Sequence, residues 1–181
     1  MNPIFRKHFS QIGEGMTLLD EDELHAAIAA LRLTKQNGGT VYIFGNGGSH
    51  ATASHFANDL MKMTRTKAIC IGDSVPTVSA YGNDEGHGHM FSMPLETLIK
   101  PFDCAVGISC SGNSENVIKG LLMTRVRGGI TIGLTGLSNS SLINKMDMDA
   151  LIHARVPDIR VQEDLHSIVC HAIVRSLQEE Q

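Results

Sequence analysis

The sequence predicts an α/β protein with a doubly wound, mostly parallel five-stranded sheet flanked by helices. Five short apolar runs recur along the chain, and segments with helical spacing of apolar residues separate them. Each run is apolar without alternation, which is typical of strands buried on both faces of a parallel sheet. The expected strands are Val41–Phe44, Ala68–Ile71, Cys104–Ile108, Ile130–Leu134 and Leu151–Val156.

The helices are predicted from the same periodicity and from the residues that stop it. Two helices precede the first strand, and Leu24, Ile28 and Leu31 form one apolar stripe of the second helix. The Asn-Gly-Gly sequence at residues 37–39 ends that helix. The predicted helices are Pro3–Leu19, Glu21–Gln36, His50–Lys62, roughly Val75–Leu98 with breaks at Gly82, Gly86 and Pro94, Glu115–Arg127, Ser140–Lys145 and Val161–Gln181.

A chain of 181 residues fits one domain with a sizeable core. Residues 1–181 are therefore expected to form a single domain, with residues 1–37 as an N-terminal helical pair and residues 38–181 as the α/β core. The two leading helices carry more apolar side chains than a five-stranded sheet can cover, which favours homo-oligomerisation through them. These side chains are Met16, Leu18, Leu19, Leu24, Ile28 and Leu31.

Composition and charge exclude several classes of partner. The formal net charge is −4 and no basic tract occurs, so we expect no binding to nucleic acid and none to acidic membranes. Neither a signal peptide nor an apolar run long enough to span a bilayer is present in the sequence. The cysteines lack CxxC spacing and are expected to be buried free thiols in a reducing cytoplasm. They are Cys70, Cys104, Cys110 and Cys170.

Two loops rich in Gly and Ser follow the first and the third predicted strand, and each leads into a helix. The first is Gly-Asn-Gly-Gly-Ser-His at residues 45–50, and the second is Ser-Cys-Ser-Gly-Asn-Ser at residues 109–114. Such junctions present backbone N–H groups and a helix N-terminus to an anion. Neither loop has the Gly-Lys-[Ser/Thr] ending of a P-loop or the GxGxxG spacing of a dinucleotide fold. A small phosphorylated metabolite is therefore the expected ligand.

Histidine and carboxylate side chains occur at helical spacing in two segments. His55 and Asp59 lie four residues apart and share a helix face after the first loop. In the terminal helix, Glu163 lies eight residues before His171 and Asp164 lies seven before it. Both spacings place the carboxylate near the helix face that carries His171. Such pairs on two helices could hold a zinc-like divalent ion or act as an acid and a base on one substrate, and they are also compatible with two ordinary polar helix faces.

These residues, in this order, resemble the sugar isomerase (SIS) domain family, and within it the phosphoheptose isomerases and their non-enzymatic relatives. The resemblance covers nearly the whole chain and implies an isomerase that converts sedoheptulose 7-phosphate into D-glycero-D-manno-heptose 7-phosphate through an enediol, feeding heptose into surface glycans. It also implies one zinc ion per site and a homotetramer with active sites between subunits. The matching stretches are GNGGSHATASHFANDL at 45–60, GND at 82–84, expected as a turn, ISCSGNSENVIKG at 108–120 and QEDLHSIVCH at 162–171.

The resemblance further implies roles for individual residues. Asp59 would act as the base and His171 as its acid–base partner, although the family usually has Glu at the position of Asp59. The zinc ligands would be His55, Asp59, Glu163 and His171, and the family usually has Gln at the position of Glu163. Serines of the second loop would hold the phosphate. The full implied set of substrate-binding residues is Asn46, Gly47, Gly48, Ser49, Asn83, Asp84, Ser109, Cys110, Ser111, Ser114 and Glu163.

Other functions fit the same resemblance. A non-catalytic tetrameric relative binds the bacterial replication initiator, and SIS domains act as phosphosugar sensors in some transcription regulators. The presence of His55, Asp59 and His171 favours an enzyme over a scaffold. The sequence shows neither helix-turn-helix spacing nor a basic face, which argues against a DNA-binding regulator. An isomerase or binding protein for a different sugar phosphate is also compatible with these residues.

Overall fold

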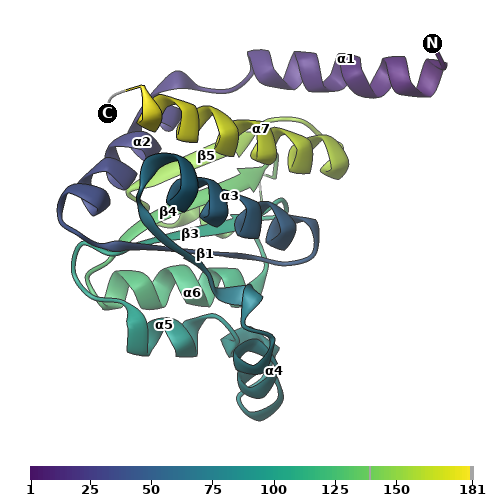
Figure 1. Ribbon diagram of the computed structural model, residues 1–181. Coiled ribbons are helices and arrows are strands. Elements are labelled where there is room, and N and C mark those ends of the chain that lie inside the picture. Colours follow the sequence, from purple (N-terminus) through teal and green to yellow (C-terminus); the bar gives the residue numbers. More distant parts are fainter. Residues whose placement is uncertain (139, 180–181) are drawn as a thin grey trace.

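Helices cover both faces of one parallel sheet, as the sequence predicts (Figure 1). The computed structural model describes residues 1–138 and 140–179. The strand order is β2-β1-β3-β4-β5, and each neighbouring pair is parallel. The strands are β1 (Thr40–Gly45), β2 (Lys67–Cys70), β3 (Cys104–Ser109), β4 (Ile130–Gly136) and β5 (Ala150–Ala154). The α-helices are α1 (Pro3–Thr17), α2 (Glu21–Gln36), α3 (Gly48–Thr64), α4 (Val75–Asp84), α5 (Ser92–Leu98), α6 (Glu115–Val126) and α7 (Ile159–Gln178).

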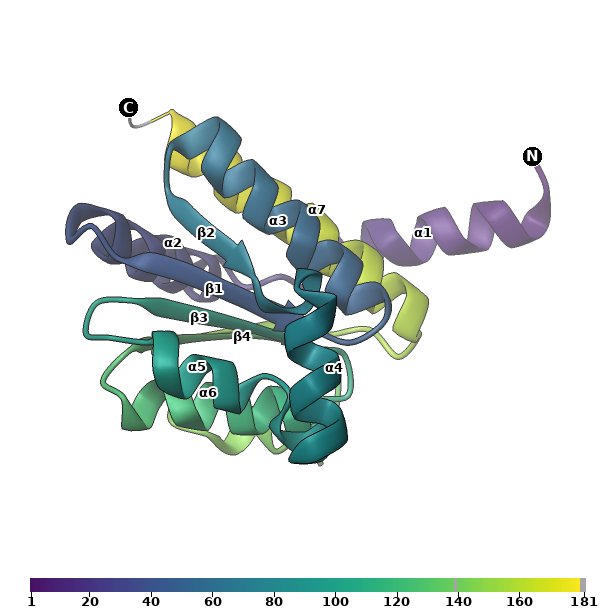
Figure 2. The same cartoon turned by 60° about the horizontal axis from the view of Figure 1, so that its bottom comes forward.

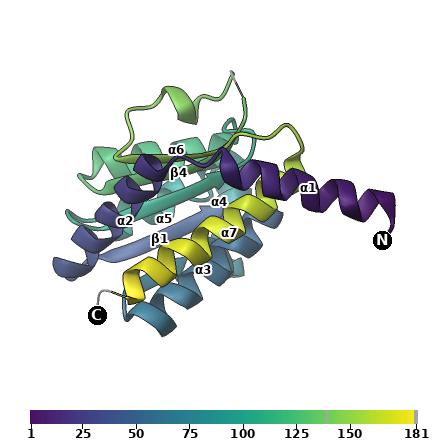
Figure 3. The ribbon, with the colours of Figure 1, turned by 90° about the horizontal axis from the view of Figure 1, so that it is seen from above.

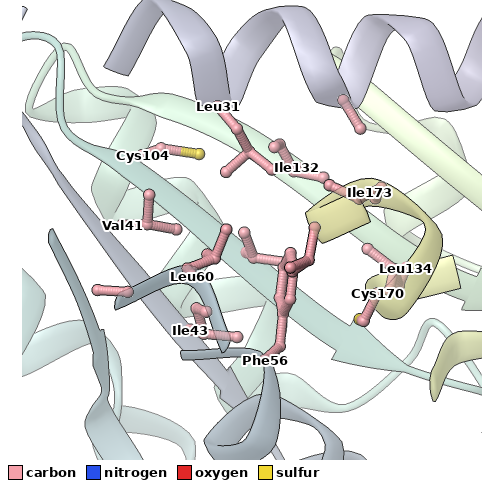
Figure 4. Packing of buried hydrophobic residues seen from close by; sticks show 14 of the residues in the cluster. Leu31, Val41, Ile43, Phe56, Leu60, Cys104, Ile132, Leu134, Cys170 and Ile173 are labelled. Atoms are coloured by element: carbon pink, nitrogen blue, oxygen red, sulfur yellow. The ribbon is translucent and has the colours of Figure 1, made fainter. Parts of the chain in front are cut away.

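Alternation along the strands divides the core into two halves. Val41 and Ile43 of β1 belong to one half, whereas Tyr42 and Phe44 belong to the other, because successive side chains of a strand point to opposite faces. The first half packs against α2, α3 and α7, and the second against α5 and α6. Figure 4 shows the first half, in which Phe56 of α3 lies among side chains of the strands and of α7. Burial on both faces explains why the strands are continuously apolar.

The strand order creates a topological switch point between β1 and β3. After β1 the chain enters α3 on one face of the sheet, and after β3 it enters α6 on the other face. The loops that follow these two strands therefore diverge at the carboxyl edge of the sheet, where doubly wound folds bind ligands. Both predicted anion-binding loops lie at this edge.

The two N-terminal helices differ in their surroundings. Helix α2 packs on the sheet and buries Ala27, Ile28 and Leu31. Helix α1 extends away from the domain and buries only Gly15 among its residues (Figures 1 and 2). The large apolar residues exposed on α1 are Ile4, Phe5, Phe9 and Met16, and Leu18, which follows the helix, is also exposed. Helix α1 contacts α7, where His8 Nε2 lies 2.9 Å from Asp164 Oδ2, but most of the remaining surface of α1 is uncovered.

Three local predictions were wrong. Residues 82–84 form the last turn of α4 rather than a loop turn, and the chain bends at Gly86, which has φ +90°. A glycine inside a helix costs only about 1 kcal/mol relative to alanine, so Gly82 does not break α4. Pro94 is the third residue of α5, where its missing N–H removes no hydrogen bond within the helix. The helix expected at residues 140–145 is only a 3₁₀ turn, η3 (Ile143–Lys145), because so short a segment rarely nucleates an α-helix.

The terminal helix α7 begins two residues earlier than predicted. Asp158 caps it by accepting a hydrogen bond from the backbone N–H of Arg160 at 2.9 Å. Residues 180 and 181 of the predicted helix lie outside the described residues. None of the helices described in residues 1–138 and 140–179 has the length and apolarity needed to cross a membrane.

Candidate active site

Helices α3 and α7 lie side by side and bring three of the predicted site residues together (Figure 3). The Asp59 Oδ2 atom lies 3.1 Å from His55 Nε2 and 3.8 Å from His171 Nε2. The two imidazole Nε2 atoms are 3.2 Å apart, and their rings meet edge to face. One ligand atom from each residue lies within 4.8 Å of the other two, so the three form a compact group that could hold a metal ion.

The three side chains differ in exposure. The Asp59 side chain is 14% exposed, whereas the imidazoles of His55 and His171 are 60% and 54% exposed. The carboxylate is thus shielded beneath two imidazoles that face solvent. Two imidazoles and a carboxylate are the donor types of a borderline-soft divalent cation, and they are also the groups that move protons near neutral pH. The site therefore suits either metal binding or acid–base chemistry.

Glu163 does not join this group. It precedes His171 by eight residues on α7, which corresponds to a rise of about 12 Å, so sharing a helix face does not bring the two side chains together. Its carboxylate instead lies over Gly48, where an added Cβ would come within 2.6 Å of Glu163 Oε1. Gly48 is the first residue of α3, so the Glu163 carboxylate faces the N-terminus of this helix. The sequence predicts an anion from the ligand at this position.

The second loop gathers three serine hydroxyls. Ser109 Oγ lies 3.1 Å from Ser114 Oγ and 3.4 Å from Ser111 Oγ, and it accepts the backbone N–H of Gly112 at 3.2 Å. Gly112 has φ +63°, a conformation that favours glycine and tightens the loop. Ser114 precedes α6 but its hydroxyl does not cap that helix. The free N–H groups at the start of α6 and the clustered hydroxyls form a suitable cradle for a phosphate group.

Both loops and α7 line one small cavity of about 150 Å³. A crossed pair of side-chain amides ties the loops together, since Asn46 and Asn116 each donate to the other at 2.9 and 2.8 Å. Asn116 is 1% exposed and is a residue that sequence reasoning missed, although it lies within the quoted 108–120 stretch. The cavity is lined by Asn46, Ser49, Ile108, Ser109, Cys110, Ser111, Ser114, Ile159 and Glu163.

Asn83 and Asp84 lie outside this cavity. They end α4, which stands apart from α3 and α7 in Figure 2, and both are exposed. Asn83 Nδ2 donates to Asp84 Oδ1 at 2.7 Å. Within one chain, the structure therefore brings the residues of the two loops together but leaves this pair at the surface.

Cys110 in the second loop is a buried thiol rather than a nucleophile. Burial and the neighbouring charge of Glu163 raise the pKa of Cys110 to about 11, so the thiol stays protonated at neutral pH. Its Sγ lies 3.9 Å from His166 Nδ1, and His166 Nε2 lies 3.0 Å from the carbonyl oxygen of Thr135. Because that oxygen only accepts, Nε2 carries the proton and Nδ1 is free to accept from the thiol. All four cysteines are free and buried, as predicted.

His166 should make the protein less stable in mild acid. It is 1% exposed, and burial lowers its pKa below the ordinary value near 6.5. As the pH falls through that value, the unfolded chain takes up a proton that the folded chain binds more weakly, so the free energy of unfolding decreases. We expect urea unfolding to show a smaller loss of stability between pH 7.5 and 5.5 in His166→Gln than in the wild type. The exposed control His25→Gln should keep the wild-type loss, and equal losses in all three proteins would contradict this account.

Comparison with known proteins places this chain in a family. Residues 5–136 match the SIS domain family. Among curated proteins, the chain is 36% identical to the phosphoheptose isomerase of Enterobacter sp. (strain 638), with 98% of this chain and 96% of that protein covered. It is 39% identical to the phosphoheptose isomerase of Trichlorobacter lovleyi, with 84% and 82% covered.

Solved structures agree with this result. The phosphoheptose isomerase of Neisseria gonorrhoeae superposes with a TM-score of 0.88 at 31% identity, covering 97% of this chain and 95% of that one. The phosphoheptose isomerase of Francisella tularensis superposes with a TM-score of 0.87 at 28% identity, covering 98% and 96%. Both the sequence matches and the fold therefore lead to one assignment: the chain belongs to the SIS domain family and, within it, to the phosphoheptose isomerases.

Proposed function

We propose that this protein isomerises sedoheptulose 7-phosphate to D-glycero-D-manno-heptose 7-phosphate. The observation that carries the proposal is that α7 borders two different kinds of site. Glu163 lies in the serine-lined cavity, and His171 lies in the acid–base group about 12 Å further along the helix. An extended seven-carbon sugar phosphate has a comparable length. Such a ligand can place its phosphate at one end of this stretch and its reacting carbons at the other.

The phosphate end supplies orientation. We assign the phosphate to the hydroxyls of Ser109, Ser111 and Ser114, beside the Cys110 backbone and the N-terminus of α6. Fixing this end holds the reacting carbons in place, which converts proton transfer into an effectively unimolecular step. We assign the sugar hydroxyls to the remaining implied residues of the first loop and of α4, which are Asn46, Gly47, Gly48, Ser49, Asn83 and Asp84.

Asp59 and His171 carry the proton transfers in this proposal. The Asp59 carboxylate takes a proton from C1 of the ketose and returns it to C2 of the enediol. The imidazole of His171 donates a proton to the C2 oxygen and accepts one from the C1 hydroxyl, so the overall reaction is balanced. The Asp59 side chain is 14% exposed, so solvent reaches the carboxylate and can exchange with the proton it carries.

The same group fits a zinc ion. His55, Asp59 and His171 offer two imidazole nitrogens and a carboxylate within the required reach. Bound there, zinc would stabilise the negative charge that develops on the enediolate oxygens. Glu163 remains in our proposal as a residue of the substrate cavity, because its carboxylate lies over Gly48 and outside the group of three.

We also propose a homotetramer with active sites between subunits. Exposed apolar residues such as Phe5 and Phe9 on α1 give that helix a surface to bury against another copy. A neighbouring subunit would also explain how Asn83 and Asp84 reach a substrate, since neither lines the cavity of its own chain. The four buried free thiols support a reducing compartment, and we place the enzyme in the cytoplasm.

Proton NMR of sedoheptulose 7-phosphate incubated with the protein in D₂O tests the function directly. We expect an aldoheptose phosphate to appear with deuterium at C2, because the proton carried by Asp59 exchanges with solvent. Chelation followed by zinc addition should remove and then restore turnover. A folded, zinc-loaded protein that converts no heptose phosphate would contradict the proposal, and binding of the replication initiator by such a protein would favour the scaffold.

Ser111→Ala should weaken substrate binding without blocking chemistry. Loss of a hydrogen bond to a charged group costs about 1.5–3 kcal/mol, which corresponds to a KM about 10- to 100-fold higher. The fold should be unchanged, since Ser111 is exposed and its hydroxyl accepts only the nearby N–H of Asn113 besides its contact with Ser109. Steady-state kinetics should show kcat within about threefold of the wild type. Ser176→Ala near the end of α7 is the control, and an unchanged KM in Ser111→Ala would exclude this serine from the phosphate site.

A further inference from the structure

A second group of side chains that could hold a metal ion lies on the other side of α3 from the active-site group. His50 comes from the first turn of α3, Cys70 ends β2, and Asp73 ends the short 3₁₀ helix η1 (Ile71–Asp73). Cys70 Sγ lies 3.6 Å from His50 Nδ1, and Asp73 Oδ1 lies 3.4 Å from His50 Nε2. One ligand atom from each residue lies within 4.8 Å of the other two.

The surroundings of Cys70 favour a thiolate bound to a cation. The backbone N–H groups of Gly72 and Asp73, two and three residues further along the chain, act to lower the pKa of Cys70. Such donors stabilise negative charge on sulfur. Burial and the Asp73 carboxylate nevertheless raise the pKa of Cys70 to about 11. In the metal-free protein, Cys70 is therefore a thiol close to the Asp73 carboxylate.

The other two ligands are held in place. The His50 ring packs against Gly72, where an added Cβ would meet the ring at 2.4 Å, so only glycine admits the imidazole at this position. Asp73 Oδ2 accepts a hydrogen bond from Ser54 at 2.9 Å. A partner that orients a carboxylate in this way is characteristic of the shell behind metal ligands. The side chains of His50 and Asp73 are 35% and 50% exposed, so a cation and a water ligand can reach the group from solvent.

This group is separate from the active-site group. His50 and His55 are five residues apart on α3, which corresponds to about 140° around the helix axis. His50 faces β2 and η1, whereas His55 faces α7. The active-site group also contains no sulfur, so the two groups differ in chemistry as well as in position.

We propose that Cys70, His50 and Asp73 form a second metal site, which binds a zinc-class divalent cation with water as the fourth ligand. Thiolate, imidazole and carboxylate are all zinc ligands, and a dication balances the charges of the thiolate and the carboxylate. Binding displaces the thiol proton to solvent as the metal–sulfur bond forms. The ion would connect α3, β2 and η1, and so would fix the start of α4, which follows η1 after one residue.

Cobalt(II) titration of the metal-free protein tests this proposal, because a cobalt–thiolate bond gives a charge-transfer absorption in the near ultraviolet that nitrogen and oxygen ligands do not. We expect roughly two equivalents of cobalt per chain in the wild type, with the thiolate band present. Cys70→Ser should lose the band and about one equivalent. His171→Gln should lose about one equivalent and keep the band, which separates this site from the proposed active site. Cys110→Ser, which removes a buried thiol beside a different histidine, should keep the band.

Two results would overturn the proposal. One is the absence of a thiolate band in the wild type at saturating cobalt, and the other is a band that persists in Cys70→Ser. If Cys70→Ser does not fold, Asp73→Asn provides the test, because this side chain is half-exposed and its amide keeps the same shape. We expect Asp73→Asn to weaken the cobalt affinity measured from the thiolate band at least about tenfold with unchanged circular dichroism. An unchanged affinity in that variant would count against Asp73 as a ligand.

Discussion

His171→Gln should lower kcat by about 10²- to 10⁴-fold, the range expected when a general acid or base is removed. His171 Nε2 lies 3.8 Å from Asp59 Oδ2 and 3.2 Å from His55 Nε2, so the substitution removes one of the two imidazoles of this group. Glutamine cannot exchange a proton near neutral pH. Because the His171 side chain is 54% exposed, the fold should tolerate the change, and circular dichroism and the melting temperature should match the wild type.

A matched control separates an effect on catalysis from a general effect of losing a histidine. His25→Gln on α2 is a matched control, since it removes an exposed histidine far along the sequence from the group and should leave kcat unchanged. A His171→Gln protein with wild-type turnover would remove this residue from the mechanism.

Phe44→Ala should produce the largest loss of stability, about 3–5 kcal/mol. The Phe44 ring is fully buried, and its centroid lies 5.2 Å from that of Phe91. Helix α6 approaches it closely, since a Cβ added at Gly120 would come within 2.8 Å of the ring. The neighbouring backbone cannot collapse easily into the space left by alanine. Urea unfolding at one fixed protein concentration measures the effect, because association with other copies would add to apparent stability.

An exposed phenylalanine provides the comparison. Phe102 is 50% exposed, and Phe102→Ala should change the free energy of unfolding by no more than about 0.5 kcal/mol. A loss below about 1 kcal/mol in Phe44→Ala would mean that the core between β1 and α6 is packed more loosely than the structure indicates.

The sheet was predictable because its signal is repeated and local. Each strand lies between two helical layers, so burial selects apolar side chains at successive positions, as from Val41 to Phe44. The position of the second Gly- and Ser-rich loop, directly after a strand and before a helix, also predicted that residues 109–114 form a candidate anion site. Helix interruptions were less predictable. Gly82 and Pro94 destabilise their helices only slightly at the positions they occupy, and the chain bends instead at Gly86, which has a positive φ.

Contacts between elements distant in sequence could not be read from spacing. A helical wheel describes the angle between Glu163 and His171 but omits the rise that separates them. The position of the Glu163 carboxylate over Gly48 depends on how α7 crosses the start of α3. In the same way, Cys70 reaches His50 only because β2 pairs with β1 at the sheet edge, and no sequence motif records that pairing.

The crossed amides of Asn46 and Asn116 have a consequence for how a ligand enters. They hold the β1 loop and the start of α6 at a fixed separation before any ligand arrives. Ordering the backbone of one flexible residue costs about 1–2 kcal/mol in conformational entropy. In these two segments the cost arises when the protein folds and not when a ligand binds. A phosphate bound as we propose would therefore meet loops that are already joined, and its affinity would not be reduced by the cost of assembling them.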